Sequence, residues 1–225
     1  MQERIPEPEL MDGPVQAQAY AEADFISVNA GFVAELAAHF RDLGPAPAIL
    51  DLGCGPGDIP VRLARALPGA RITAVDGAPA MTAYAEQAVT VAGLAGRVRV
   101  VTAALQELDE PRRPFDLVVS NSLLHHLHRP EALWEVIRQQ GVAGTAVYVM
   151  DLMRPDSREE VDALVAAYAA REPEQLREDF RHSLHAAFTP EEVREQLQAC
   201  GCAGLQVRPV SDRHLLVSGR LGGHH

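Results

Sequence analysis

A glycine-rich turn between an apolar segment and a helical one constrains this chain most. Residues 49–58 read ILDLGCGPGD, so an apolar strand is expected to run into Gly-x-Gly-x-Gly and then into a helix. Gly53, Gly55 and Gly57 permit a tight turn and let a ligand approach the backbone closely. The first strand-to-helix turn of an open parallel sheet commonly lines a ligand crevice. The turn therefore predicts a ligand site at one edge of such a sheet.

Apolar strand-like segments and helical segments alternate along most of the chain. Strands are expected at 48–52, 71–75, 98–102, 115–120, 145–151, 205–210 and 213–219. Helices are expected at 58–67, 79–92, 130–140 and 189–200. Strands separated by helices indicate βαβ units and a mostly parallel sheet that is covered on both faces. The predicted fold class is therefore α/β.

Composition shifts divide the chain into five expected segments. An N-terminal helical cap is expected over 1–44, and the sheet-forming core over 45–151. The mostly helical segment 152–188 lies where a short connection would suffice, so we interpret it as an inserted lid. Residues 189–221 would complete the core with a helix and strands. Residues 222–225, which end in two histidines, resemble a linker and the remnant of a purification tag.

The overall composition disfavours several classes of partner. The chain has 225 residues, is 47% hydrophobic and carries a formal net charge of −11, with no basic stripe for nucleic-acid phosphates. No apolar run approaches the ~20 residues that span a bilayer. The polar, acidic N-terminus is unlike a secretory signal, so a cytoplasmic location is expected. The three cysteines suggest no disulfide framework, and either a monomer or a homodimer is compatible with the sequence.

The residues around the turn indicate what the ligand carries. A dinucleotide fingerprint would place its third glycine at position 58, which is Asp58 here. Asp51 and Asp58 would repel a pyrophosphate and favour a cationic ligand. Asp76 ends the second expected strand, at about the distance where such folds place an acid on ribose hydroxyls. S-adenosylmethionine combines a ribose with a positive charge and has no phosphate.

Three stretches together resemble a known family. ILDLGCGPGD, ITAVDGAPAM and FDLVVSNSLLHHL are similar to the class I S-adenosylmethionine-dependent methyltransferases. The likeness runs from about residue 48 to residue 151 and is weaker as far as residue 219. It implies a Rossmann-like, doubly wound, seven-stranded sheet, mostly parallel with an antiparallel last strand. Within the family, the chain resembles the small stand-alone bacterial enzymes that act mainly on small molecules.

The resemblance also implies roles for residues at matching positions. The backbone at Gly53, Gly55 and Gly57 would contact the methionine end of S-adenosylmethionine, and Asp51 would set the turn or meet the ammonium group. Asp76 would hold the ribose hydroxyls. Many relatives carry an Asp after the third strand, where this chain has alanines. Further cofactor contacts implied in this way are Gly77, Met81, Ala104, Leu105, Asn121 and Tyr20.

The histidine-rich stretch SNSLLHHLHRP follows the fourth expected strand, beside the expected methyl group. A metal site of His125, His126 and His128 is disfavoured, because neighbouring side chains diverge and no carboxylate lies within the run. A structural role and a role in orienting or deprotonating the methyl acceptor both remain open. If one histidine is catalytic, we expect it to be His125 or His126. No metal is expected.

Topology places further candidates at the acceptor mouth. Asp151 and Arg154 follow the fifth expected strand, and His214 lies at the start of the last one. His185 belongs to the expected lid. We predict that these four residues contact the acceptor, although surface or capping roles are open for each.

The predicted function is transfer of a methyl group from S-adenosylmethionine to an oxygen, nitrogen or sulfur atom of a small molecule. Three alternatives remain. A methyltransferase acting on RNA or protein is disfavoured by the net charge and by Ser120-Asn121-Ser122-Leu123 in place of Asn-Pro-Pro-Tyr. A nucleotide-dependent oxidoreductase is disfavoured by Asp58. The last alternative is a non-catalytic module that only senses the cofactor.

Overall fold

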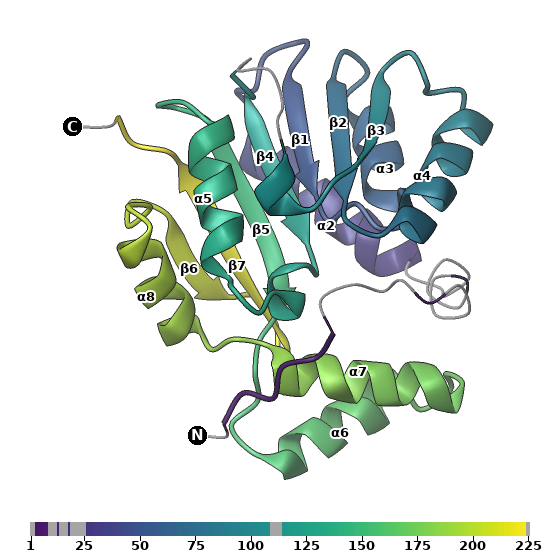
Figure 1. Cartoon of the computed structure of the whole chain (residues 1–225), viewed down its shortest axis with the longest axis vertical. Helices are drawn as coiled ribbons and strands as arrows, with labels where there is room; N and C mark the ends of the chain where they lie inside the picture. Colours follow the sequence, from purple (N-terminus) through teal and green to yellow (C-terminus); the bar gives the residue numbers. More distant parts are fainter. Residues whose placement is uncertain (1–2, 9–12, 14–17, 19–25, 109–113, 224–225) are drawn as a thin grey trace.

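The computed structural model describes residues 3–8, 13, 18, 26–108 and 114–223. These residues form a sheet of seven strands with helices on both faces (Figure 1). The strand order is β3-β2-β1-β4-β5-β7-β6. The strands are β1 (Ala48–Leu52), β2 (Arg71–Asp76), β3 (Val98–Thr102), β4 (Leu117–Asn121), β5 (Ala146–Leu152), β6 (Gln206–Pro209) and β7 (His214–Arg220).

Strand direction follows the predicted pattern. The pairs β3–β2, β2–β1, β1–β4 and β4–β5 are parallel, whereas β7 is antiparallel to both β5 and β6. The prediction of a doubly wound, mostly parallel sheet with an antiparallel last strand is therefore confirmed. The carboxyl ends of β1, β2, β4 and β5 meet at one edge of this sheet, because parallel strands end on the same side.

Helices follow the strands in the expected alternation. Their bounds are α2 (Ile26–His39), α3 (Asp58–Ala66), α4 (Pro79–Val91), α5 (Glu131–Gln140), α6 (Arg158–Tyr168), α7 (Glu174–Ala186) and α8 (Pro190–Ala199), with short 3-10 turns η1 (Leu105–Glu107) and η2 (Leu124–His126). Figure 1 shows α2, α3 and α4 on one side of the sheet and α5 and α8 on the other. No helix among these described residues is both long and apolar enough to cross a membrane.

Each face of the sheet carries its own apolar core. Successive side chains of a strand point to opposite faces, so Ile49 packs in the cluster that includes Phe32 and Leu63, while Leu50 packs with Trp134 and others. All five of these side chains are buried. Apolar burial on both faces explains why the central strands read as continuous apolar runs.

The start of α8 carries a capping box. The Thr189 hydroxyl accepts a hydrogen bond from the Glu192 backbone, and the Glu192 carboxylate accepts one from the backbone N–H of Thr189. These bonds satisfy two donors that a helix start leaves unpaired. They fix the chain where it re-enters the sheet after the inserted helices.

The insertion between β5 and α8 consists of α6 and α7, which pack on each other beyond the edge of the sheet where β1, β2, β4 and β5 end (Figure 1). Leu152, Val161 and Leu184 form a separate apolar cluster there. Residues 3–8, which we call the N-terminal strap, run alongside α7, and the Ile5 N–H donates to the His185 carbonyl (3.0 Å). The strap and the inserted helices therefore lie beside the predicted active-site edge.

Candidate active site

The glycine turn adopts a backbone that other residues rarely take. Gly53, Gly55 and Gly57 have φ angles of 75°, 52° and 91°. A Cβ on Gly53 would lie 2.9 Å from Leu123 Cβ, and one on Gly57 would lie 2.8 Å from Ala85 Cα. A Cβ on Gly55 would meet no atom within 4 Å. The outer glycines thus let η2 and α4 pack closely, while Gly55 leaves open space above the turn.

Asp76 joins the glycine turn to the end of β2. Its Oδ2 accepts a hydrogen bond from the Gly55 backbone N–H, and its Oδ1 accepts one from the Ala78 N–H, both at 2.9 Å. Burial raises the pKa of the Asp76 carboxyl, although the two backbone donors oppose this shift. The acid therefore borders the turn with both oxygens held in fixed positions.

A pocket opens above the turn, at the edge where the parallel strands end. Its walls come from β2, α4, η1, the end of β4 and η2. Predicted cofactor residues that line this pocket are Gly53, Gly55, Asp76, Gly77, Met81, Ala104, Leu105 and Asn121, and the other lining residues are Val75, Ala78, Ala103, Gln106, Ser122, Leu123, His126 and Leu127. Topology thus brings together residues from positions 53 to 127. Tyr20 lies outside the described residues.

Asp51 lies beneath the turn and is 1% exposed. Its Oδ2 has no hydrogen-bond partner within the described residues. Burial, together with the nearby charge of Asp76, raises the pKa of the Asp51 carboxyl to about 8. A buried carboxyl with an unpaired oxygen is costly unless a donor or a cation approaches it. Its surroundings therefore suit a cationic ligand group.

The end of β4 is strained where it meets the pocket. Ser122 has φ of 58°, a left-handed conformation that is uncommon outside glycine. The amide oxygen of Asn121 is buried and has no hydrogen-bond partner among the described residues. Such features cluster at functional sites, where the surrounding structure holds them in place. Asn121 thus offers an acceptor to a ligand in the pocket.

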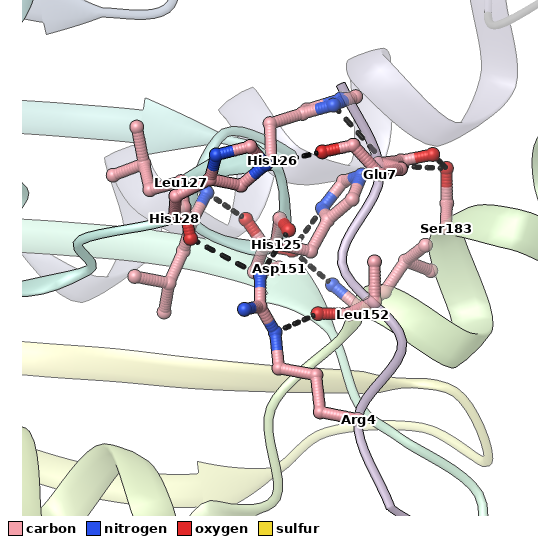
Figure 2. Close-up of polar contacts among 11 residues, drawn as sticks. Arg4, Glu7, His125, His126, Leu127, His128, Asp151, Leu152 and Ser183 are labelled. Atoms are coloured by element: carbon pink, nitrogen blue, oxygen red, sulfur yellow. Dashed lines mark hydrogen bonds and ion pairs between the residues drawn. The ribbon is translucent and has the colours of Figure 1, made fainter. Parts of the chain in front are cut away.

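The two adjacent histidines of η2 have different environments (Figure 2). His125 is buried, and its Nδ1 lies 2.5 Å from Asp151 Oδ1. Burial alone would lower the pKa of His125, but the Asp151 carboxylate outweighs it and the pKa is raised. His126 lines the pocket, and burial followed by the charge of His125 lowers the pKa of His126 to about 3. His126 is therefore neutral and a weak base.

Asp151 fixes η2 to the end of β5. Its Oδ2 accepts a hydrogen bond from the Leu124 N–H (2.6 Å), while Oδ1 meets His125 and the Leu152 N–H. Burial would raise the pKa of Asp151, but the neighbouring His125 lowers it. Asp151, which the sequence predicted to contact the acceptor, thus holds η2 in position.

The other predicted acceptor residues do not line the pocket formed by the described residues. The Arg154 guanidinium is buried against Glu192 (2.6 Å) and the Ala187 carbonyl (3.1 Å). His185 lies in the last turn of α7, where burial and the nearby Arg158 lower its pKa. His214 Nδ1 lies 3.0 Å from Ser211 Oγ, and burial lowers the pKa of His214 to about 4.

Sequence reasoning missed the N-terminal strap. Arg4 donates to the carbonyls of Ala186 (2.6 Å), His125 (2.8 Å) and Leu127 (3.1 Å), which ties the strap to η2 and α7. The strap brings the Glu7 carboxylate to the two histidines, with Oε1 3.5 Å from His125 Nε2 and 3.2 Å from His126 Nδ1 (Figure 2). Burial raises the pKa of Glu7. A carboxylate from the far end of the sequence therefore completes the site.

An open parallel sheet with a glycine turn after β1 and an acid at the end of β2 defines a Rossmann-like protein with a nucleoside-type pocket. Residues 49–141 match a family model described as a methyltransferase domain. The chain is similar to the solved structure of a SAM-dependent methyltransferase from Aquifex aeolicus, with a TM-score of 0.67 at 17% identity over 93% of this chain and 98% of that one. At this identity the likeness shows the fold.

Two curated relatives share more of the sequence. A trans-aconitate 2-methyltransferase from Streptomyces avermitilis is 34% identical over 175 residues, or 76% of this chain and 63% of that protein. A release factor glutamine methyltransferase from Chlorobaculum tepidum is 37% identical over 108 residues, or 47% of this chain and 35% of that protein. The chain thus spans between about a third and two thirds of these relatives' lengths. Residues 49–141 thus form a methyltransferase domain, and the described part of the chain has the fold of the class I S-adenosylmethionine-dependent methyltransferases.

Proposed function

We propose that this chain binds S-adenosylmethionine above the glycine turn and transfers its methyl group to a small-molecule acceptor. The observation that carries the proposal is Asp76, which closes the turn through Gly55 and borders a pocket lined by Met81 and Asn121. Each carboxylate oxygen of Asp76 has acceptor capacity left for a ribose hydroxyl. Met81 offers an apolar surface to the adenine.

The charges around the turn agree with this ligand. The unpaired Oδ2 of Asp51 is suited to a cationic ammonium group. The carboxyls of Asp51 and Asp76 both lie near the turn and disfavour a pyrophosphate. The amide oxygen of Asn121 offers a further acceptor to the amino-acid end of the ligand. The pocket therefore favours S-adenosylmethionine over a dinucleotide.

Methyl transfer is an in-line displacement in which the acceptor atom attacks the methyl carbon and the C–S electron pair stays on sulfur. Positioning supplies most of the catalysis in such a step. We assign His126 to orienting the acceptor, because it lines the pocket and is a neutral hydrogen-bonding group. His125 is a positioning residue in this scheme, since Asp151 holds its Nδ1 side.

A small acceptor is supported by two observations. The net charge of −11 disfavours a nucleic-acid substrate, and the strap and inserted helices lie beside the sheet edge where the parallel strands end (Figure 1). A curated relative is named for trans-aconitate, so this tricarboxylate is the first acceptor to test. Phenols, thiols and other small acids are the acceptors to test next.

Calorimetric titration with S-adenosylhomocysteine, with NAD as the control ligand, tests the proposal. We expect S-adenosylhomocysteine, and not NAD, to bind with micromolar or tighter affinity. Asp76→Asn should weaken that affinity at least about tenfold, since a hydrogen bond to a charged group contributes about 1.5–3 kcal/mol. Glu107→Gln, which changes an acid on η1 outside the lining residues, is the matched control. Binding of NAD, or no binding of S-adenosylhomocysteine, would overturn the proposal.

Methyl transfer is then measured as S-adenosylhomocysteine formation with each acceptor. Turnover with a small molecule in the absence of protein or RNA supports the proposed substrate class. Turnover only with a protein or RNA fraction would replace that class and leave the cofactor assignment intact.

A further inference from the structure

Three potential metal-ligating side chains converge beside the proposed acceptor position. They are Glu7 of the N-terminal strap and His125 and His126 of η2, and their ligand atoms all lie within 4.8 Å of one another. All three are largely removed from solvent, with side-chain exposures of 13%, 4% and 15%. We propose that these residues form a site for a divalent transition metal of the zinc type.

The distances fit a single ion between the three side chains. Glu7 Oε1 lies 3.2 Å from His126 Nδ1 and 3.5 Å from His125 Nε2. With metal–ligand bonds of about 2.0–2.1 Å, two ligands of a tetrahedral zinc ion lie about 3.3–3.4 Å apart. Small side-chain rotations would therefore bring all three atoms into coordination.

The hydrogen bonds around His126 indicate that a lone pair faces Glu7. His126 makes a hydrogen bond to the backbone of Pro8, and proline has no N–H, so the histidine ring must be the donor. His126 Nδ1 is buried and makes no hydrogen bond within the described residues, so the donor is Nε2. In the neutral ring, Nδ1 then carries a lone pair. A lone pair 3.2 Å from a carboxylate oxygen is unfavourable unless a proton or a cation lies between them, and a metal ion would bind all three converging ligand atoms at once.

His125 offers a second lone pair in the same direction. Its Nδ1 is occupied by Asp151 at 2.5 Å, which leaves Nε2 facing Glu7 (Figure 2). A carboxylate that holds one ring nitrogen while the other binds a metal is the usual outer-shell arrangement of metal-binding histidines. Ser183 plays a similar part for the carboxylate, because its hydroxyl donates to Glu7 Oε1 at 3.1 Å.

The strap is fixed well enough to present its ligand. Arg4 is bound to three carbonyls and lies 4.1 Å above the Phe188 ring. His128 Nε2 donates to the Glu7 carbonyl at 2.8 Å. These contacts hold the backbone of the strap at Arg4 and at Glu7, and thereby place the Glu7 side chain. This set differs from the three histidines that the sequence analysis considered and disfavoured, since His128 binds the strap backbone and Glu7 supplies the third side chain.

Two histidines and one carboxylate leave a fourth position for an exchangeable ligand, as in catalytic zinc sites. His126 lines the pocket, so this position faces the proposed acceptor. The ligand class is an oxygen donor, either a hydroxyl or a carboxylate of the acceptor. A coordinated hydroxyl would lose its proton to solvent more easily, and its oxygen would then form the bond to the methyl carbon. This catalytic part rests on the proposed function, whereas metal binding does not.

Metal binding is tested on the full-length chain after treatment with a chelator. Zn²⁺ is titrated calorimetrically and Co²⁺ is followed by its visible absorption, which reports four- or five-coordinate geometry. We expect one site with micromolar or tighter affinity. Asp151→Asn should weaken binding about 10–100-fold, as outer-shell changes do, and Glu7→Gln should weaken it at least as much. Glu3→Gln on the same strap and His39→Gln on α2 are the matched controls and should leave affinity unchanged.

Cooperative thermal unfolding of every variant, compared with that of the parent chain, checks that each remains folded. Zinc binding that persists in Glu7→Gln would overturn the inference, because the ion would then be held elsewhere, for instance by His224 and His225. Failure of the parent chain to bind either metal would also overturn it. A proton, and not a metal ion, would then lie between Glu7 and the histidines. Metal binding without S-adenosylhomocysteine binding would support the site and refute the proposed function.

Discussion

Replacing Asp51 by Asn should make the stability of the free protein less dependent on pH. The pKa of Asp51 is raised from its ordinary value of 3.8 to about 8 by burial and by Asp76. The folded state therefore holds this proton more tightly than the unfolded state. The folded state loses stability as pH rises from about 4 to about 8, which is the sign expected for a carboxyl whose pKa is raised on folding.

The size of the effect follows from the two pKa values. At ~1.4 kcal/mol for each tenfold change in proton affinity, the cost of Asp51 reaches about 4 kcal/mol at pH 7 and about 6 kcal/mol above pH 8. An asparagine side chain at this position would keep the shape and remove the charge, so it avoids this cost. Asp51→Asn should thus be stabilising at pH 8.5 by several kcal/mol, and nearly neutral at pH 4.5.

Denaturant unfolding of both proteins at pH 4.5, 7 and 8.5 measures this difference. Asp156→Asn, at an exposed carboxylate, is the control for the loss of one negative charge. Titration with S-adenosylhomocysteine adds a second readout, since a ligand ammonium near Asp51 should release up to about one proton at pH 7. Calorimetry in two buffers of different ionisation enthalpy counts that proton, and Asp51→Asn should abolish it. A stability difference that stays constant with pH would refute the reasoning.

Four further substitutions test the site and its support. Gly57→Ala should destabilise the protein by more than about 2 kcal/mol in thermal unfolding, because φ is 91° and the new Cβ would lie 2.8 Å from Ala85 Cα. Gly55→Ala, with open space around it, should cost only the left-handed backbone penalty of about 1 kcal/mol; equal losses would contradict this account. Asn121→Ala should weaken S-adenosylhomocysteine binding about five- to tenfold without destabilising the free protein, since its buried oxygen has no partner among the described residues; unchanged affinity in calorimetry would exclude the contact. Thr189→Ala should cost about 1 kcal/mol of unfolding free energy by removing the capping box of α8; no change would show that the cap is dispensable.

The fold could be predicted from local patterns because several helices between the strands are marked at their ends by proline or glycine. Pro68-Gly69 follows α3 and Gly93 follows α4, so their expected and observed bounds differ by about one residue. The glycine turn and Asp76 could be placed together for a similar reason. Both follow strands of one parallel sheet, and parallel topology brings such ends to a common edge.

The directions of individual side chains were harder to predict. His125 and His126 are adjacent on a 3-10 turn and their ring centroids lie 4.1 Å apart, yet Asp151 binds the Nδ1 of His125 while His126 lines the pocket. Nothing in the local sequence pattern distinguishes them. Arg154 follows β5 as expected, yet Glu192 of α8 binds its guanidinium. Such a partner depends on tertiary packing of α8, which no local pattern specifies.

Glu7 could not be placed because its partners lie more than a hundred residues away, and local periodicity carries no information about such contacts. Its immediate sequence nevertheless explains why the strap can be ordered. Pro6 and Pro8 flank Glu7, and a residue before proline favours an extended backbone. Proline also restricts the unfolded chain, which lowers the entropy lost when the segment is fixed. Ordering this extended strap therefore needs few contacts, and those of Arg4 with three carbonyls and of Ile5 with α7 supply them. A short segment in which two prolines flank a glutamate can in this way deliver a carboxylate to a buried histidine pair.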